Sequence, residues 1–337
     1  MKSKVDAAMI TLLKKAKGVQ FGKTNVPAMA SGGNGISANW GNGITMNAWG
    51  HQFISASSSG GSGVAVASYL ATIAITEDTG GSTLSPSTLN HNFGYDPPKF
   101  HYPNQGNPSL TVRNDQIGVN ARSIDDIIAF DQAILGTQAA HAKAAAYVAG
   151  LSNSDIRIGC SDVNFNYSLM SPAIADKYNQ VKNVLLTAGF TFVDTCAKKN
   201  PYTVVPSNYS NSVYIDELQY HITNNLKVNL SVFEVMTNGN FAFANHNPIG
   251  TRIPPGGSGC VNTGWNVNQT VIDEYLGRIP AARADVYNEY YNQYNVDLVM
   301  GPSGYCDFVT MAVSIILRMK LIGLNYHLRL ISDSRMR

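Results

Sequence analysis

The sequence predicts an α/β fold, and three observations support this prediction. An amphipathic helical pattern over 5–16 runs into a glycine and then a short apolar segment, the order of elements that begins an α/β layer. A buried strand at 73–75 leads directly into a glycine-rich bend, a common place for functional groups in α/β proteins. At 337 residues, the chain is long enough to form a large core without disulfides or metal ions.

The first half of the chain is expected to alternate helices and strands. Three lysines lie in the last turn of the first helix, where they interact favourably with the helix dipole, and Gly18 is expected to end the helix. Residues 19–21 are expected to form a strand. The small residues of 64–67 are expected to begin a second helix. Ser123 is expected to cap a third helix, which begins at Ile124 with two aspartates in its first turn.

The second half is punctuated by polar segments. Residues 93–115 are rich in Pro, Asn and Gly and are expected to form a surface excursion. Strands are expected at 156–160 and 296–300, and a helix at 178–188. The irregular segment 200–275 is expected to supply a variable wall for a substrate. No internal repeat is visible.

Charge and hydropathy exclude several classes of partner. The chain has 24 basic and 22 acidic residues, so no global field attracts nucleic acid or an anionic membrane. The longest apolar run near the end, 308–317, has about ten residues, whereas a membrane-spanning helix needs about twenty. The compartment stays open between cytoplasmic and secreted. Four Asn-x-Ser/Thr sequons leave room for secretion, at Asn166, Asn208, Asn229 and Asn268.

Cysteine and histidine patterns predict neither a metal nor a cofactor. The four cysteines are far apart without a C-x-x-C pair, which argues against a zinc knuckle or a redox motif. Scattered buried thiols are therefore expected, with disulfides left open. They are Cys160, Cys196, Cys260 and Cys306. The seven histidines are scattered, and each is interpreted as structural.

Two glycine-rich segments imitate nucleotide-binding loops without matching them. Gly18 lies one residue too close to Gly22-Lys23-Thr24 for a phosphate-binding loop. Gly33-Asn34-Gly35 is not completed to G-x-G-x-x-G, because position 38 is alanine. Nucleotide binding is therefore not expected.

The most specific pattern consists of two short motifs on either side of the 64–67 helix. The run Ser-Ser-Ser-Gly-Gly-Ser-Gly occupies 57–63, and Asp-Thr-Gly-Gly-Ser occupies 78–82. Together they resemble the amidase signature family, whose mark is G-G-S-S-G-G followed by D-x-G-G-S. The segments 22–25 (G-K-T-N) and 115–126 (D-x-x-G-x-x-A-R-S-x-x-D) also match the family, and the resemblance extends over residues 1 to 302.

The resemblance implies the family's fold and a serine mechanism without histidine. The implied fold is a central mixed β-sheet covered by helices on both faces, incomplete at its N- and C-terminal ends. Ser82 would be the nucleophile, and Ser58, on a cis peptide, would relay its proton to a neutral lysine. Backbone amides of four residues would form the oxyanion hole, where glycine lets the backbone approach the developing charge. These are Thr79, Gly80, Gly81 and Ser82, and the supporting loop residues are Ser59, Gly60, Gly61 and Asp78.

The chain also departs from the family pattern. Ala56-Ser57 replaces the first glycine pair, Leu84 stands where the family has arginine, and 94–97 departs from G-L-K-P-T. The family's base lysine lies in a P-x-x-x-K-D segment well before G-K-T-N, and no such segment is present; Lys23 matches a structural position. The chain is therefore expected to contain a partial domain at 1–307, truncated at both ends. Residues 318–337 are basic and lack helix-capping or turn signals, so 308–337 is interpreted as an atypical tail that is out of frame.

The resemblance implies an amidase that hydrolyses carboxamide C–N bonds through a serine acyl-enzyme, impaired because the base lysine is missing. The expected partner is a small-molecule amide, with a homodimer left open. Two alternatives remain: a catalytically dead, amide-binding descendant, and an amidotransferase A-type subunit. An incomplete sheet would also expose strand edges, which favour aggregation.

Overall fold

The structure is a computed structural model of the whole chain. It describes residues 6–27, 30, 44–99, 101–107, 115–136, 138–161, 165, 167–197, scattered positions from 274 to 285, and 287–303, together with the backbone of two later strands at 313–321 and 324–332. The expectation for 200–275 and the four sequon asparagines lie outside these residues.

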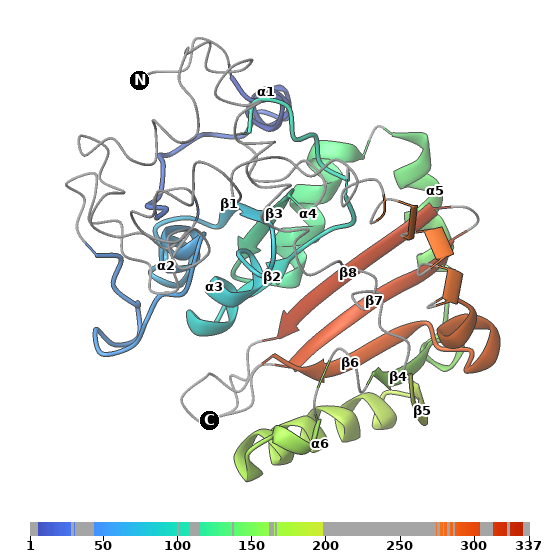
Figure 1. Cartoon of the computed structure of the whole chain (residues 1–337). Helices are drawn as coiled ribbons and strands as arrows, with labels where there is room; N and C mark the ends of the chain where they lie inside the picture. Colours follow the sequence, from blue (N-terminus) through green and yellow to red (C-terminus); the bar gives the residue numbers. More distant parts are fainter. Residues whose placement is uncertain are drawn as a thin grey trace.

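An eight-stranded mixed sheet runs through the molecule in the order β1-β3-β2-β8-β7-β6-β4-β5 (Figure 1). Strand β4 is parallel to both of its neighbours, whereas the other pairs are antiparallel. The strands are β1 Ile73–Asp78, β2 Phe93–Tyr95, β3 Gln116–Ala121, β4 Arg157–Ser161, β5 Thr191–Ala197, β6 Leu298–Pro302, β7 Val313–Leu321 and β8 Leu324–Ser332. The helices are α1 Ala8–Lys15, α2 Gly60–Ala67, α3 Leu84–Leu89, α4 Ile124–Leu135, α5 Ala139–Ala149 and α6 Pro172–Thr187, with short turns η3 Asn153–Asp155, η4 Tyr167–Leu169 and η9 Asn288–Gln293.

Strand β3 shows why helices cover both faces of this sheet. Its side chains alternate between the faces, and five of its six residues are buried. Ile117 and Val119 join the apolar cluster beneath α1 and α4. On the opposite face, Asn120 donates a hydrogen bond to the carbonyl of Thr83, the residue before α3. The predicted α/β architecture, a mixed sheet with helices on both faces, is confirmed.

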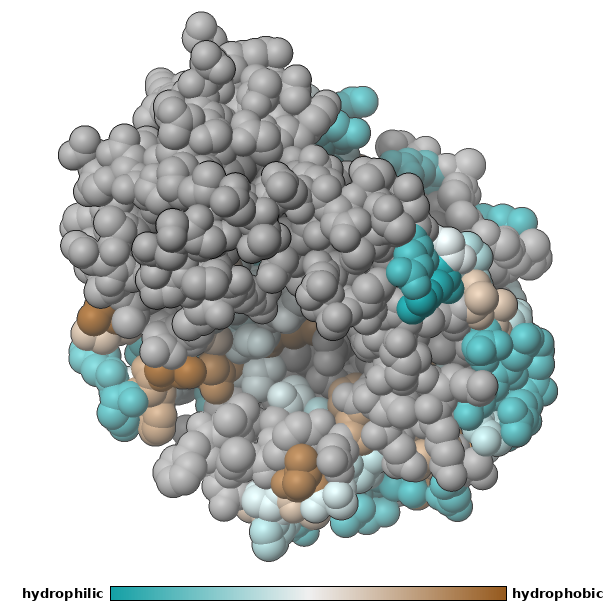
Figure 2. Space-filling model, in the orientation of Figure 1, coloured by the Kyte–Doolittle hydropathy of each residue, from teal (hydrophilic) through white to brown (hydrophobic). Residues whose placement is uncertain are grey.

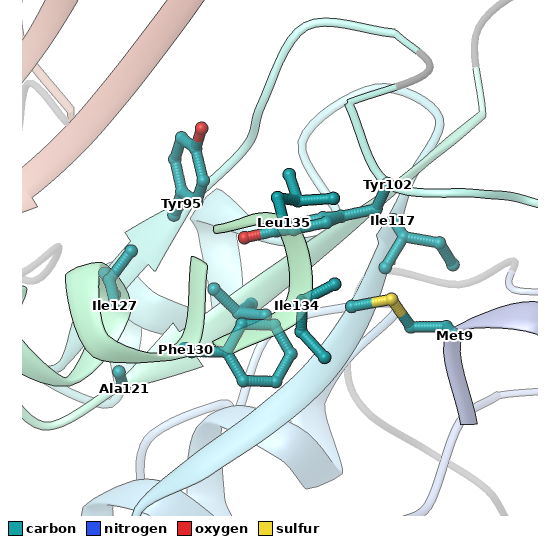
Figure 3. Packing of buried hydrophobic residues seen from close by; sticks show 10 residues of the cluster. Met9, Tyr95, Tyr102, Ile117, Ala121, Ile127, Phe130, Ile134 and Leu135 are labelled. Atoms are coloured by element: carbon teal, nitrogen blue, oxygen red, sulfur yellow. The ribbon is translucent and has the colours of Figure 1, made fainter. Parts of the chain in front are cut away.

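The largest apolar cluster lies between α1, α4 and the β1–β3 part of the sheet. Figure 3 shows Phe130 and Ile134 of α4 pointing toward Met9 of α1 and Ile117 of β3. The α4 helix begins as the sequence predicts, because the Ser123 hydroxyl accepts a hydrogen bond from the Asp126 amide at 3.0 Å.

The ends of two predicted helices differ from the structure. The α2 helix ends at Ala67, near the point where it was expected to begin, and its first turn is formed by glycines of the serine-rich run. The α6 helix begins at Pro172 rather than 178, with Ser171 as its cap, and Gly189 follows it at φ 95°. Both helices therefore begin earlier than the apolar pattern indicated, and in α6 the cap formed by Ser171 and Pro172 sets the start.

Two other expectations about the first part of the chain are wrong. Residues 19–21 form no strand, and the side chains of Val19 and Phe21 are 88% and 83% exposed. The segment 93–115 is only partly a surface excursion, because it begins with β2 and contains the fully buried Tyr102. Apolar side chains are also exposed along 44–54, and Figure 2 shows brown surface near this segment at the lower left margin. Sequence pattern alone did not separate buried from exposed apolar runs here.

Cysteines 160 and 196 form a disulfide, which corrects the expectation of scattered thiols. The two residues are register partners on the neighbouring parallel strands β4 and β5, with their Cα atoms 4.5 Å apart. Because β5 is the last strand of the sheet, the bond ties an edge strand to its neighbour. Cys260 and Cys306 lie outside the described residues.

The last thirty residues contain β7 and β8, which lie in the sheet between β6 and β2. The interpretation of 308–337 as an out-of-frame tail concerns the nucleotide sequence, and it stays a prediction. Among the described residues, none of the helices has the length and apolar character needed to cross a bilayer.

Replacing Cys196 by serine is expected to lower the free energy of unfolding by about 3–4 kcal/mol, because the disulfide closes a loop between residues 36 positions apart and restricts the unfolded chain. Urea unfolding of the wild type and of Cys196→Ser measures this loss. Cys160→Ser and the double variant serve as controls. They should lose about the same amount as the single variant, since one bond is lost in each case; a double variant that loses the sum would contradict the disulfide.

Candidate active site

The loop from β1 to α3 is shaped by the buried carboxylate of Asp78. One carboxylate oxygen accepts the Gly81 amide at 2.5 Å, and the other accepts the Thr83 amide at 2.7 Å. Asp78 itself is only 4% exposed, and hydrogen bonds to a charged acceptor are stronger than neutral ones. The carboxylate therefore fixes the backbone on both sides of Ser82.

Gly81 has φ +112°, a conformation that side chains with a Cβ rarely adopt. Its amide, which the resemblance places in the oxyanion hole, donates to Asp78 instead. Among the described residues, the amides of Thr79, Gly80 and Ser82 donate to no other group. Three backbone donors on the turn that carries Ser82 are thus left for a ligand.

The serine-rich loop lies against this turn. Its Ser57–Ser58 peptide is cis, as the resemblance implies for Ser58. The Ser59 amide donates to the Ser82 carbonyl at 3.3 Å, and Ser58 is 2% exposed. The structure therefore brings together the two motifs that lie apart in the sequence.

The first turn of α2 packs closely on the segment 22–25. A Cβ on Gly61 would lie 2.5 Å from the backbone nitrogen of Asn25, so only glycine fits at this contact. The Ser62 hydroxyl lies 2.9 Å from that of Thr24 and donates to the Ile75 carbonyl at 3.0 Å. Gly61 and Ser62 thus connect the first turn of α2 to the segment 22–25 and to β1.

Buried asparagines connect α3 to the serine loop, and the sequence analysis did not identify them. The Asn90 amide nitrogen donates to the carbonyls of Ser55 and Pro86, each at 2.9 Å. The Asn92 amide nitrogen donates to the Gly63 carbonyl of α2 at 2.8 Å. Asparagines that follow a short helix carry no motif, so no signal in the sequence pointed to them.

Glu77 is a further residue that the sequence analysis missed. It precedes the D-x-G-G-S motif and, by strand alternation, lies on the same face of β1 as the apolar Ile73 and Ile75. Burial, followed by the Asp115 and Asp78 charges, raises its pKa to about 9. A carboxyl group on an otherwise apolar strand face, next to a motif, is the signal that could have identified it.

Among the lysines that the structure describes, none lies at the position that the resemblance assigns to the base. Among the described residues, no ammonium group contacts the Ser58 or Ser82 hydroxyl. Lys23 is exposed. The Lys99 ammonium donates to the Asp115 carbonyl at 3.0 Å.

Comparison of the sequence with protein families and with curated proteins gives consistent results. The Amidase family model matches residues 1–260. Mandelamide hydrolase from Pseudomonas putida is 34% identical over 160 residues, which is 47% of this chain and 30% of that protein. The A-type subunit of the glutamyl-tRNA(Gln) amidotransferase from Deinococcus radiodurans is 35% identical over 124 residues, 37% of this chain and 25% of that protein. The chain therefore aligns with less than a third of the length of either relative.

Solved structures share the fold. An amidase family protein from Bacillus anthracis superposes with a TM-score of 0.66 at 18% identity, covering 97% of this chain and 68% of that one. Peptide amidase from Stenotrophomonas maltophilia gives a TM-score of 0.62 at 20% identity, covering 98% and 73%. The family model matches most of this chain, and the structure joins the two motifs in one site. This chain therefore belongs to the amidase signature family.

Proposed function

We propose that this site hydrolyses carboxamide C–N bonds through an acyl-enzyme on Ser82. The observation that supports it best is the set of three unengaged amides, from Thr79, Gly80 and Ser82, on a loop that Asp78 holds from behind. Preorganised backbone donors of this kind stabilise the negative charge that develops on a carbonyl oxygen under attack.

The proposed reaction has two steps. The Ser82 hydroxyl oxygen attacks the amide carbon, its proton passes through Ser58 to a base, and the C–N bond breaks as the leaving nitrogen takes up a proton. Water then attacks the resulting ester, which releases the carboxylic acid and restores the Ser82 hydroxyl. The oxyanion amides stabilise the tetrahedral intermediate in both steps.

The base is the missing component in this proposal. Since no lysine in the described part of the chain reaches Ser58 or Ser82, the serine keeps its proton near neutral pH. Loss of one member of a catalytic triad typically lowers turnover by about 10⁴- to 10⁶-fold. The 337-residue chain is therefore proposed to be an impaired hydrolase.

Two other functions remain alternatives. A descendant that binds amides without cleaving them is consistent with the missing base, and it would show saturable binding that Ser58→Ala leaves intact. An amidotransferase A-type subunit is favoured by the 35% identity to the Deinococcus radiodurans protein. Stable co-purification of the full chain with a second protein of such a complex would support this alternative.

Slow release of ammonia from mandelamide is expected, and a small primary amine added to the buffer should accelerate it by supplying the absent base. Mandelamide is chosen because one relative is a mandelamide hydrolase. Ser82→Ala should abolish both the slow and the accelerated reaction, because the nucleophile is lost. Ammonia release measured against amine concentration checks this.

Ser85→Ala is the matched control, because Ser85 is an exposed serine one turn further along, and this variant should behave as the wild type. Fast turnover without amine that requires Ser82 would contradict the impairment. Turnover that survives Ser82→Ala would contradict the proposed nucleophile.

Asp78→Asn is expected to lower the free energy of unfolding by about 2–3 kcal/mol, because both backbone amides lose a charged acceptor and one of them faces an NH₂ group. Chemical denaturation of both proteins measures this loss. Asp194→Asn, at a side chain that is 91% exposed, is the control and should change stability by less than about 0.5 kcal/mol. Equal stability of Asp78→Asn and the wild type would show that the carboxylate does not hold the loop.

A further inference from the structure

Two acidic side chains approach the same hydroxyl group beside the candidate oxyanion hole. The Thr79 Oγ1 atom lies 2.8 Å from Asp115 Oδ1 and 3.3 Å from Glu77 Oε1. Glu77 is on β1, Asp115 immediately precedes β3, and the two strands are antiparallel neighbours. The hydroxyl therefore bridges two carboxyl groups from adjacent strands.

A count of protons decides how this bridge can form. A threonine hydroxyl donates one hydrogen bond and accepts others, and an ionised carboxylate can only accept. If Thr79 donates to Asp115, the nearer group, Glu77 can contact the same oxygen favourably only by donating a proton of its own. The geometry thus favours two successive hydrogen bonds, in which Glu77 donates to Thr79 and Thr79 donates to Asp115.

The charges around Glu77 favour the same assignment. Asp115 from the start of β3, Asp78 from β1 and Asp96 from the segment after β2 all act on Glu77 as like charges. The Asp78 carboxylate accepts two loop amides. The ammonium group of Lys99, a neighbouring cation, donates to the Asp115 carbonyl.

We propose that Glu77 is a positioning residue that carries a proton, which it donates to Thr79 so that Thr79 can in turn hold Asp115. These two hydrogen bonds hold the Thr79 side chain in place. The backbone amide of Thr79 is the first of the three donors on the turn that carries Ser82. The inference rests on the proposed function only for the catalytic role of the loop, because the proton on Glu77 can be measured without a substrate.

Stability should then depend on pH with a definite sign. Burial and neighbouring carboxylates raise the pKa of Glu77 from 4.5 to about 9. Between these pH values the folded protein binds more protons than the unfolded chain, so this group lowers the free energy of unfolding as pH rises from about 4.5 to about 9. Below pH 4.5 the stabilising effect of this group is fully present and no longer changes with pH, and above pH about 9 it is completely lost.

The decisive experiment compares the wild type with Glu77→Gln, an isosteric variant that can still donate to Thr79. At neutral pH, infrared spectroscopy should show the C=O stretch of a protonated carboxyl group in the wild type and not in Glu77→Gln. The melting temperature of Glu77→Gln minus that of the wild type should increase as pH rises from about 5 to about 9. Asp194→Asn, at an exposed carboxylate, should match the wild type in both measurements.

A second variant keeps the proposal testable if Glu77→Gln does not fold. Asp115→Asn removes the strongest like charge on Glu77, so the protonated-carboxyl band should disappear at a lower pH than in the wild type. A wild-type spectrum without this band at neutral pH, or a melting-temperature difference that is constant with pH, would overturn the proposal. Absence of mandelamide hydrolysis in every variant would count against the proposed function alone, because the infrared band does not depend on turnover.

Discussion

The Asp78 carboxylate is the interaction on which the rest of the candidate site depends. It is buried at the end of β1, and the two amides it accepts lie on either side of Ser82. A buried charge is costly unless hydrogen bonds compensate it, and here the backbone itself provides that compensation. The same contacts leave the amides of Gly80 and Ser82 without a partner in the described structure, available to a ligand.

Neutral hydrogen bonds from buried asparagines join the elements around this loop. Charged residues make up only 14% of the chain, and buried asparagines connect its layers. Asn90 bridges the serine loop to α3, Asn92 bridges to α2, and Asn120 connects β3 to the residue before α3. Backbone carbonyls are the acceptors in each case, so the network fixes backbone positions directly. Both motifs therefore rest on one connected framework.

Much of the local structure and the chemistry of the motifs could be predicted from the sequence. The Ser123 cap, the strand at 73–75 and the position of Ser82 beyond a glycine-rich turn follow from short-range patterns. The strand expected at 19–21 failed because strand formation requires a partner, and no described strand pairs with this segment. The early start of α2 was missed because glycines have a low helix propensity. Here the close packing of Gly61 against Asn25 requires a glycine in the first turn of the helix.

The sequence by itself determined which residues have the chemistry: a serine after two glycines, an aspartate before them and a run of serines upstream. Only the tertiary structure decided which of these groups meet. It paired Cys160 with Cys196 across β4 and β5 and directed the Gly81 amide toward the Asp78 carboxylate. It also placed Glu77 and Asp115 next to the Thr79 hydroxyl. Each of these contacts joins residues through strand register or loop curvature. Such geometry depends on the packing of the whole sheet, which no local pattern encodes.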